Sequence, residues 1–230
     1  MDPSRLALVQ GIDDTRRTLS AWNAAPWPVV RRWLLGSVAV SVLLLLAVWA
    51  VAALSTPDDL RLLLPGLNEP AGVGDVGHVL LRNGLVLLLH AMACVAGFIA
   101  GSSLPLQAEH HNGLWRRVHE RAGPAAIAFV VCATLFSLLT QAYVLGGDAA
   151  LLARQLHTSI PLLLLTLLPH ALPELVALFL PLAAWTMASR RGAWDELLAA
   201  TFATTALAVP VLVVSANVEV FVWPHLLRAL

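Results

Sequence analysis

The sequence predicts an all-α fold, that of a polytopic helical membrane protein with about five transmembrane spans. The chain has 230 residues, of which 59% are hydrophobic and 12% charged, and ordinary soluble domains are less apolar than this. A helix needs about 20 mostly apolar residues to cross ~30 Å of hydrocarbon. Five segments meet this requirement, at roughly residues 33–55, 79–103, 124–146, 159–188 and 197–223.

The first 32 residues are more polar than the rest of the chain. Within residues 3–20, apolar side chains recur at intervals near three, four and seven among charged ones, as in a short amphipathic helix. We expect residues 1–32 to form a cytoplasmic amphipathic N-terminal segment and residues 33–230 the helical transmembrane domain. The amphipathic helix could lie on anionic lipid, dock on a partner or pack on the chain's own cytoplasmic loops. No cleaved secretory signal is expected, because the first apolar run is long enough to span.

All 14 basic residues are arginine, and they are unevenly distributed between the two sides of the predicted membrane domain. Ten fall on the side of the N-terminus. Cytoplasmic loops carry the excess of basic residues in membrane proteins, so we expect the N-terminus in the cytoplasm and the C-terminus outside. The four arginines of the opposite side are Arg61, Arg82, Arg154 and Arg228.

The fourth apolar segment contains an ionisable pair between prolines, in the stretch TLLPHALPELVAL at residues 166–178. Each proline removes a backbone donor, and the segment would be about 45 Å long as one straight helix. We therefore predict a broken fourth helix, with two pieces meeting near Pro169 and Pro173. His170 and Glu174 are four residues apart and would share a face of a continuous helix.

A charged side chain inside a bilayer is costly, so His170 and Glu174 are expected to face protein or water. In one interpretation they bond each other or satisfy carbonyl groups that the prolines leave free. In another they line a transport path, together with His90, Gln141 and Tyr143, because ionisable groups and discontinuous helices often mark such routes.

Motifs of common enzyme classes are missing from the sequence, which has no H-E-x-x-H, no G-x-S-x-G and no lysine for a phosphate-binding loop. Three histidines of the loop at residues 107–123, His110, His111 and His119, with Glu109 and Glu120, match no metal-site spacing. Cys94 and Cys132 lie in apolar runs, where free cysteine behaves as a small hydrophobe. We expect no enzymatic activity, no metal and no cofactor, and no basic stripe suggests nucleic-acid binding.

The second span contains GFIAG, in which Gly97 and Gly101 are four residues apart. This spacing lets two helix backbones approach closely. It predicts a helix-packing face.

Three stretches in order, LLRNGLVLLLHAMACVAGFIAG, LLPHALPELVALFLPLAAW and ANVEVFVWP, resemble the stage II sporulation protein M family of bacterial membrane proteins. The resemblance covers roughly residues 79–228. Where the family has a second asparagine in the first stretch, this chain has Arg82. The positions that match the family pattern are Asn83, Gly97 and Gly101, then Pro169, His170 and Glu174, then Glu219, Phe221 and Pro224.

The resemblance implies a non-enzymatic, multi-pass protein of the bacterial inner membrane that acts as a scaffold or subunit of a membrane complex. Its expected partners are the lipid bilayer and other membrane proteins or further copies of itself. The matching ionisable residues, with Asn83, would form a buried polar core. The alternative is a small transporter or channel subunit in which His170 and Glu174 form a protonatable pair.

Overall fold

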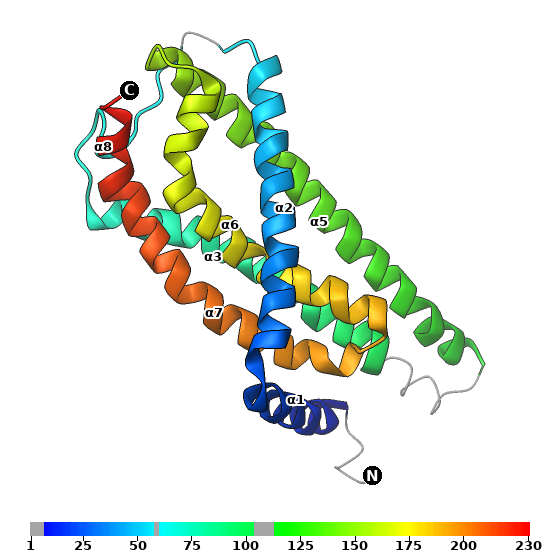
Figure 1. Cartoon of the computed structure of the whole chain (residues 1–230). Helices are drawn as coiled ribbons and strands as arrows, with labels where there is room; N and C mark the ends of the chain where they lie inside the picture. The colour runs from blue at the N-terminus through cyan, green and yellow to red at the C-terminus, as the bar shows by residue number, and fades with distance from the viewer. Residues whose placement is uncertain (1–6, 58–59, 104–112) are drawn as a thin grey trace. The chain divides into compact units, whose positions relative to one another are not determined.

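The computed structural model describes residues 7–57, 60–103 and 113–230 (Figure 1). Helices account for nearly all of these residues, and no strand occurs among them, so the predicted all-α class is confirmed. The elements in chain order are α1 (Ala7–Ala24), α2 (Pro26–Leu54), α3 (Val73–Phe98), η2 (Ile99–Ser103), α5 (Leu114–Gln155), α6 (Ile160–Arg191), η3 (Trp194–Glu196), α7 (Leu197–Asn217), η4 (Val218–Val222) and α8 (Trp223–Leu227).

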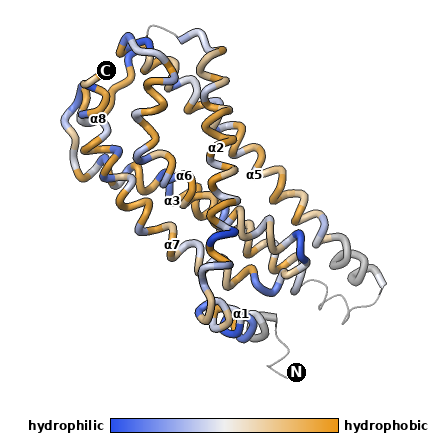
Figure 2. The backbone as a smooth tube through the Cα atoms, in the orientation of Figure 1, coloured by the Kyte–Doolittle hydropathy of each residue, from blue (hydrophilic) through white to orange (hydrophobic). Residues whose placement is uncertain are grey.

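Five helical stretches of the described chain are long and apolar enough to cross a membrane, as predicted. Figure 2 shows hydrophobic residues along most of the length of the long helices. Seven of their ten ends extend beyond the predicted spans, because hydropathy measures the apolar length of a helix whereas charged and polar residues can continue it. The spans cover Pro26–Leu54, Val73–Ser102, Ala122–Gln155, Ile160–Arg191 and Trp194–Leu227.

The third of these helices begins earlier than its apolar window. Residues 107–123 are predicted as a loop, but α5 already starts at Leu114 and runs for 42 residues with Pro124 inside it. Glu109, His110 and His111 lie outside the described residues, as do the side chains of His119 and Glu120.

The predicted break in the fourth helix is wrong, because α6 is one continuous helix of 32 residues. A proline deletes its own hydrogen bond and kinks a helix, but the bonds on either side survive. Pro169 and Pro173 both occupy exposed positions, whereas His170 between them is buried. The prolines therefore lie on the outer side of α6.

The chain divides into two compact units, and each long helix contributes residues to both. Unit 1 comprises Met1–Ser37, Leu87–Thr134 and Phe179–Leu207, and unit 2 comprises Val38–Val86, Leu135–Leu178 and Ala208–Leu230.

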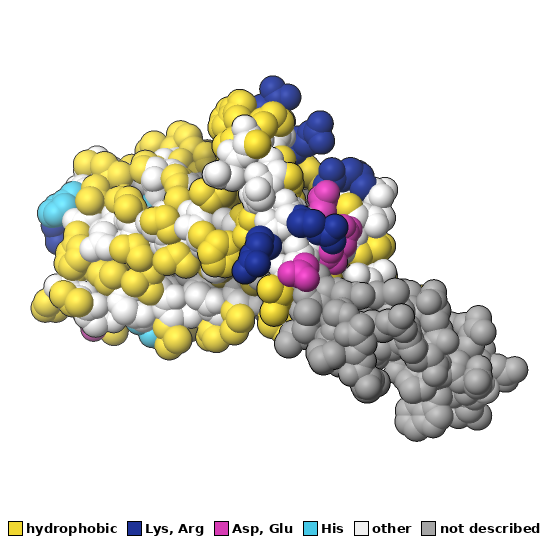
Figure 3. All heavy atoms as spheres, turned by 90° about the horizontal axis from the view of Figure 1, so that it is seen from below, with side chains coloured by type: hydrophobic (Ala, Val, Ile, Leu, Met, Phe, Trp, Pro, Cys, Tyr) yellow, Lys and Arg dark blue, Asp and Glu magenta, His cyan; other side chains and the backbone are white. Residues whose placement is uncertain are grey.

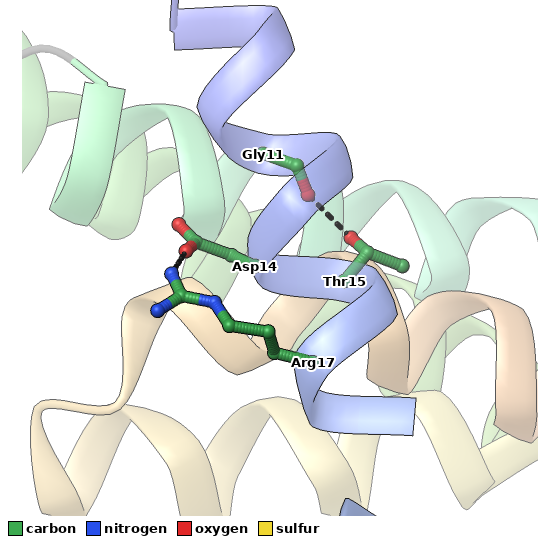
Figure 4. Close-up of polar contacts among 4 residues, drawn as sticks. All are labelled: Gly11, Asp14, Thr15 and Arg17. Atoms are coloured by element: carbon green, nitrogen blue, oxygen red, sulfur yellow. Dashed lines mark hydrogen bonds and ion pairs between the residues drawn. The ribbon is translucent and has the colours of Figure 1, made fainter. Parts of the chain in front are cut away.

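Unit 1 is packed around Trp33, Leu180, Ala184 and Ala200, with the N-terminal helix α1 against it. A Cβ atom on Gly11 of α1 would lie 2.9 Å from the Phe98 ring, so α1 packs closely against the rest of its own chain. Packing on the same chain is one of the three alternatives considered for this helix. Figure 4 shows how the helix is tied internally, by a Thr15 hydroxyl that donates to the Gly11 carbonyl at 2.6 Å and by an ion pair between Arg17 and Asp14.

Unit 2 is packed around small residues of α2 and α5 with larger ones of α6 and α8. In lipid there is no hydrophobic driving force between helices, so van der Waals contacts must stabilise their packing. Small residues increase these contacts because they let the helix backbones approach closely. At Gly146, α5 and α2 are too close for any side chain, because a Cβ atom there would lie 2.6 Å from the Val51 side chain.

Candidate functional site

A polar cluster in unit 2 contains three of the residues singled out in the sequence, Asn83, Glu174 and Glu219. Glu174 of α6 has the Asn83 side chain of α3 beside it and Glu219 of η4 within electrostatic range. Arg82, also of α3, interacts electrostatically with Glu174 and with Glu219. The cluster thus brings together residues separated by up to 137 positions in the chain, from Arg82 to Glu219.

Arg82 is the cation of this cluster. Besides the two glutamates, it interacts electrostatically with Asp148 of α5, so three carboxylates from three elements lie within electrostatic range of one guanidinium. If all were ionised, the cluster would carry two excess negative charges, three minus one. Coulomb energies grow several-fold as the local dielectric constant falls from that of water. The arrangement therefore couples charged residues of α3, α5, α6 and η4 electrostatically.

The polar atoms of Glu174 and Asn83 are buried without complete hydrogen bonding. Glu174 Oε2 and Asn83 Nδ2 have no partner at standard hydrogen-bond geometry among the described residues, although the two side chains lie close enough for a weaker polar contact. An unsatisfied buried polar atom costs about 1–3 kcal/mol.

His170 takes part in a separate contact on the same helix. Its ring packs against Trp223 of α8 with 5.2 Å between the ring centroids, and the Trp223 Nε1 donates a hydrogen bond of 3.2 Å to the Thr166 hydroxyl. Thr166 in turn donates to the Leu163 carbonyl at 2.7 Å. His170 is 4% exposed, and its Nδ1 has no hydrogen-bond partner among the described residues.

Among the described residues, no hydrogen bond or ion pair joins His170 to Glu174, although both lie on α6 four residues apart. Their inward faces meet different partners, an indole for the histidine and a charged cluster for the glutamate. The predicted pairing of the two side chains is thus not what holds them in place.

The C-terminal motif lies in an unusual turn of the last span. Glu219 and Phe221 belong to η4, a π-helical turn of five residues, and Pro224 opens the short helix α8. Wide turns of this kind are rare and often occur at functional sites. Here the turn precedes a proline that cannot donate a backbone hydrogen bond.

The loop before α3 contacts this turn and the helix that follows it. The Arg228 guanidinium donates to the Gly66 carbonyl, and Gly66 has φ of +76° with Pro224 so close that a Cβ atom would lie 2.8 Å from its ring. Only glycine adopts that conformation without strain. Figure 1 shows this loop running past α8.

The other predicted residues lie elsewhere. Gly97 and Gly101 belong to unit 1, where added Cβ atoms would meet Trp185 at 2.7 Å and Trp194 at 2.2 Å. These glycines admit tryptophan rings from later segments of the same chain.

The residues of the predicted transport path have separate surroundings. Tyr143 is 74% exposed, Gln141 donates to Ser137 of its own helix at 3.0 Å, and His90 packs against Phe179 in unit 1. Within the described residues, no group of three histidine, cysteine or acidic side chains is placed to hold a metal ion.

Arg82, Asp148 and Trp223 belong to the site but are not among the predicted site residues. The signal of Arg82 and Asp148 in the sequence is a charged residue inside or near the end of an apolar span, whereas Trp223 has no such signal. Asp148 lies two residues beyond the predicted third span, and Arg82 is the point at which the chain departs from the family pattern.

Long apolar helices around an internal polar cluster define a multi-pass helical membrane protein. Residues 122–224 match the sequence model of the family described as Stage II sporulation protein M. The match supports membership of this family and confirms the resemblance seen in the sequence. It includes His170, Glu174, Glu219 and Pro224, whereas Asn83, Gly97 and Gly101 precede it. No curated protein and no solved structure shows a significant match to the chain.

Proposed function

We propose that the chain is a non-enzymatic subunit or scaffold of a membrane complex in the bacterial inner membrane, with its N-terminus in the cytoplasm. The family match and the resemblance support this proposal, because the sporulation member of the family looks like a scaffold. The polar cluster then has a structural role, which is to fix the helices whose outer surfaces contact partners.

The observation that carries the proposal is the uncovered surface of α5. In its apolar window 17% of the residues are buried within the chain, against 28 to 44% for the other four spans. Uncovered side chains recur every seven residues on this helix, at Phe129, Phe136 and Tyr143, which are 72%, 73% and 74% exposed. A seven-residue repeat is the spacing with which long helices pack side by side.

The test is to extract the protein from its native membrane in a mild detergent and to measure the mass of the protein component. A subunit should remain in a complex of fixed stoichiometry, larger than the 24.5 kDa of one chain. Isolation as a single chain at every concentration would contradict the proposal.

A matched pair of variants locates the contact. Phe136→Ala on α5 should raise the concentration at which half of the complex dissociates by roughly tenfold, because aromatic anchors at interfaces contribute on the order of 1–2 kcal/mol or more. Phe202→Ala removes the same ring from α7, where it is 66% exposed, and should change dissociation little. Equal effects of the two variants would show that α5 is not the interface.

A further inference from the structure

A pocket of about 250 Å³ in unit 1 combines an aromatic wall with a basic rim. Three arginines contribute to its lining, Arg32 from α2 and Arg190 and Arg191 from the end of α6. The polar cluster described above belongs to unit 2 and shares no residue with this pocket.

The apolar wall is built by Trp22, Trp33 and Met187. The two indole rings meet edge to face, with centroids 5.0 Å apart and planes at 81°, and Trp33 is 4% exposed because it belongs to the core of unit 1. The wall is therefore fixed by packing before any ligand arrives.

The rim is fixed by the end of α6. The helix stops at Gly192, which has φ of +68°, and the Ala193 amide donates back to the Ala188 carbonyl at 3.0 Å. This glycine stop turns the chain into η3, where Glu196 pairs with Arg191 at 3.0 Å.

The pocket carries an excess of positive charge. Its three arginines and one glutamate leave two positive charges, three minus one. Arg191 is paired with Glu196, whereas no described carboxylate forms an ion pair with Arg32 or Arg190. Figure 3 shows arginine side chains gathered with acidic ones in one region of the surface, beside hydrophobic side chains.

The sequence places these arginines at the ends of apolar spans. Arg32 directly precedes the long apolar run of α2, and Arg190 follows that of α6. Tryptophan and arginine at such ends mark the level of the lipid headgroups. Basic pockets between membrane helices at this level bind anionic headgroups, and arginine forms bidentate hydrogen bonds with phosphate oxygens.

We propose that this pocket binds the phosphate of an anionic phospholipid headgroup, with Arg32 and Arg190 as its ligands. The Trp22 and Trp33 rings line the side that the glycerol part of the lipid contacts. Glu196 limits the affinity by neutralising Arg191. This inference does not depend on the proposed role in a complex.

The test is a titration of the detergent-purified full chain with phosphatidylglycerol or phosphatidylcholine, with bound lipid counted by native mass spectrometry. Phosphatidylglycerol should bind at least about tenfold more tightly, and inorganic phosphate or glycerol phosphate at equal concentration should not displace it. Equal binding of the two lipids would overturn the proposal. Displacement by the free phosphates would show a small-anion site instead of a lipid site.

Charge-matched variants separate the pocket from general attraction. Arg32→Gln with Arg190→Gln should weaken phosphatidylglycerol binding by roughly tenfold or more, while Arg31→Gln with Arg61→Gln, which removes the same charge outside the pocket, should change it less than about twofold. Equal losses would overturn the site.

One further variant guards against misfolding as an explanation. Glu196→Gln leaves Arg191 without its carboxylate and should strengthen phosphatidylglycerol binding by roughly threefold. A damaged fold cannot produce tighter binding, so unchanged or weaker binding by this variant would contradict the proposed role of the rim.

Discussion

At the scale of single residues, Arg82 is the cation that acts on the carboxylates of the polar cluster in unit 2. It interacts with Asp148, Glu174 and Glu219, and two of these carboxylates also act on each other. Removing the arginine leaves like charges facing each other, whereas removing Glu174 relieves that repulsion. Loss of the Arg82 charge should therefore lower the stability of the protein, whereas loss of the Glu174 charge should not.

We predict that Arg82→Gln lowers the thermal midpoint in detergent by several degrees, while Glu174→Gln changes it little. The double variant should be more stable than the sum of the single effects predicts, with a coupling of about 0.5–1 kcal/mol, at the low end of the usual range because Arg82 is exposed. Thermal unfolding of all four proteins measures this double-mutant cycle. Strict additivity would mean that the two side chains do not interact.

At the scale of elements, α3 contains one glycine that close packing requires and another that has no neighbouring side chain. Gly97 faces Leu197 and Trp185, where a Cβ atom would come within 2.7 Å of each. Gly84 lies on the same helix with no atom within 4 Å of such a Cβ. The same substitution should therefore have opposite effects at the two positions.

Gly97→Ala should destabilise the protein by about 1–3 kcal/mol, because an added methyl group must displace packed side chains. Gly84→Ala should stabilise it by up to about 1 kcal/mol, because alanine favours the helix and meets no neighbour. Thermal unfolding in detergent with helix content as the signal compares the two. Similar midpoints for both variants would contradict the packing described here.

At the scale of the whole molecule, five helices long and apolar enough to cross a membrane predict chain termini on opposite sides of it. The excess of arginine on the N-terminal side predicts which side is cytoplasmic. Cys94 is buried and Cys132 exposed, so a Cys132→Ala background leaves a protein suited to surface labelling.

In that background we expect Arg61→Cys to react with an impermeant maleimide on intact cells. Ser20→Cys on α1 should react only after the membrane is permeabilised. Both positions are exposed, so a difference in labelling would show on which side of the membrane each residue lies and would not reflect burial. Labelling of Ser20→Cys alone on intact cells would reverse the orientation.

The sequence predicted the helices better than their interruptions. Apolar length identifies a span, because the bilayer sets it, but it does not locate ends formed by polar residues, as the early start of α5 at Leu114 shows. Prolines at 169 and 173 suggested a break where α6 is continuous, because neighbouring hydrogen bonds survive the loss of one donor.

By itself, the sequence determined the class of the protein and the helices on which Asn83, His170, Glu174 and Glu219 lie, since composition and local spacing suffice for that. Only the tertiary structure decided the partners of these residues. His170 packs on Trp223 and Glu174 lies within electrostatic range of Glu219 and Arg82, although His170 and Glu174 are neighbours on one helix. Contacts between distant segments depend on how the helices pack, and no spacing within one segment encodes them.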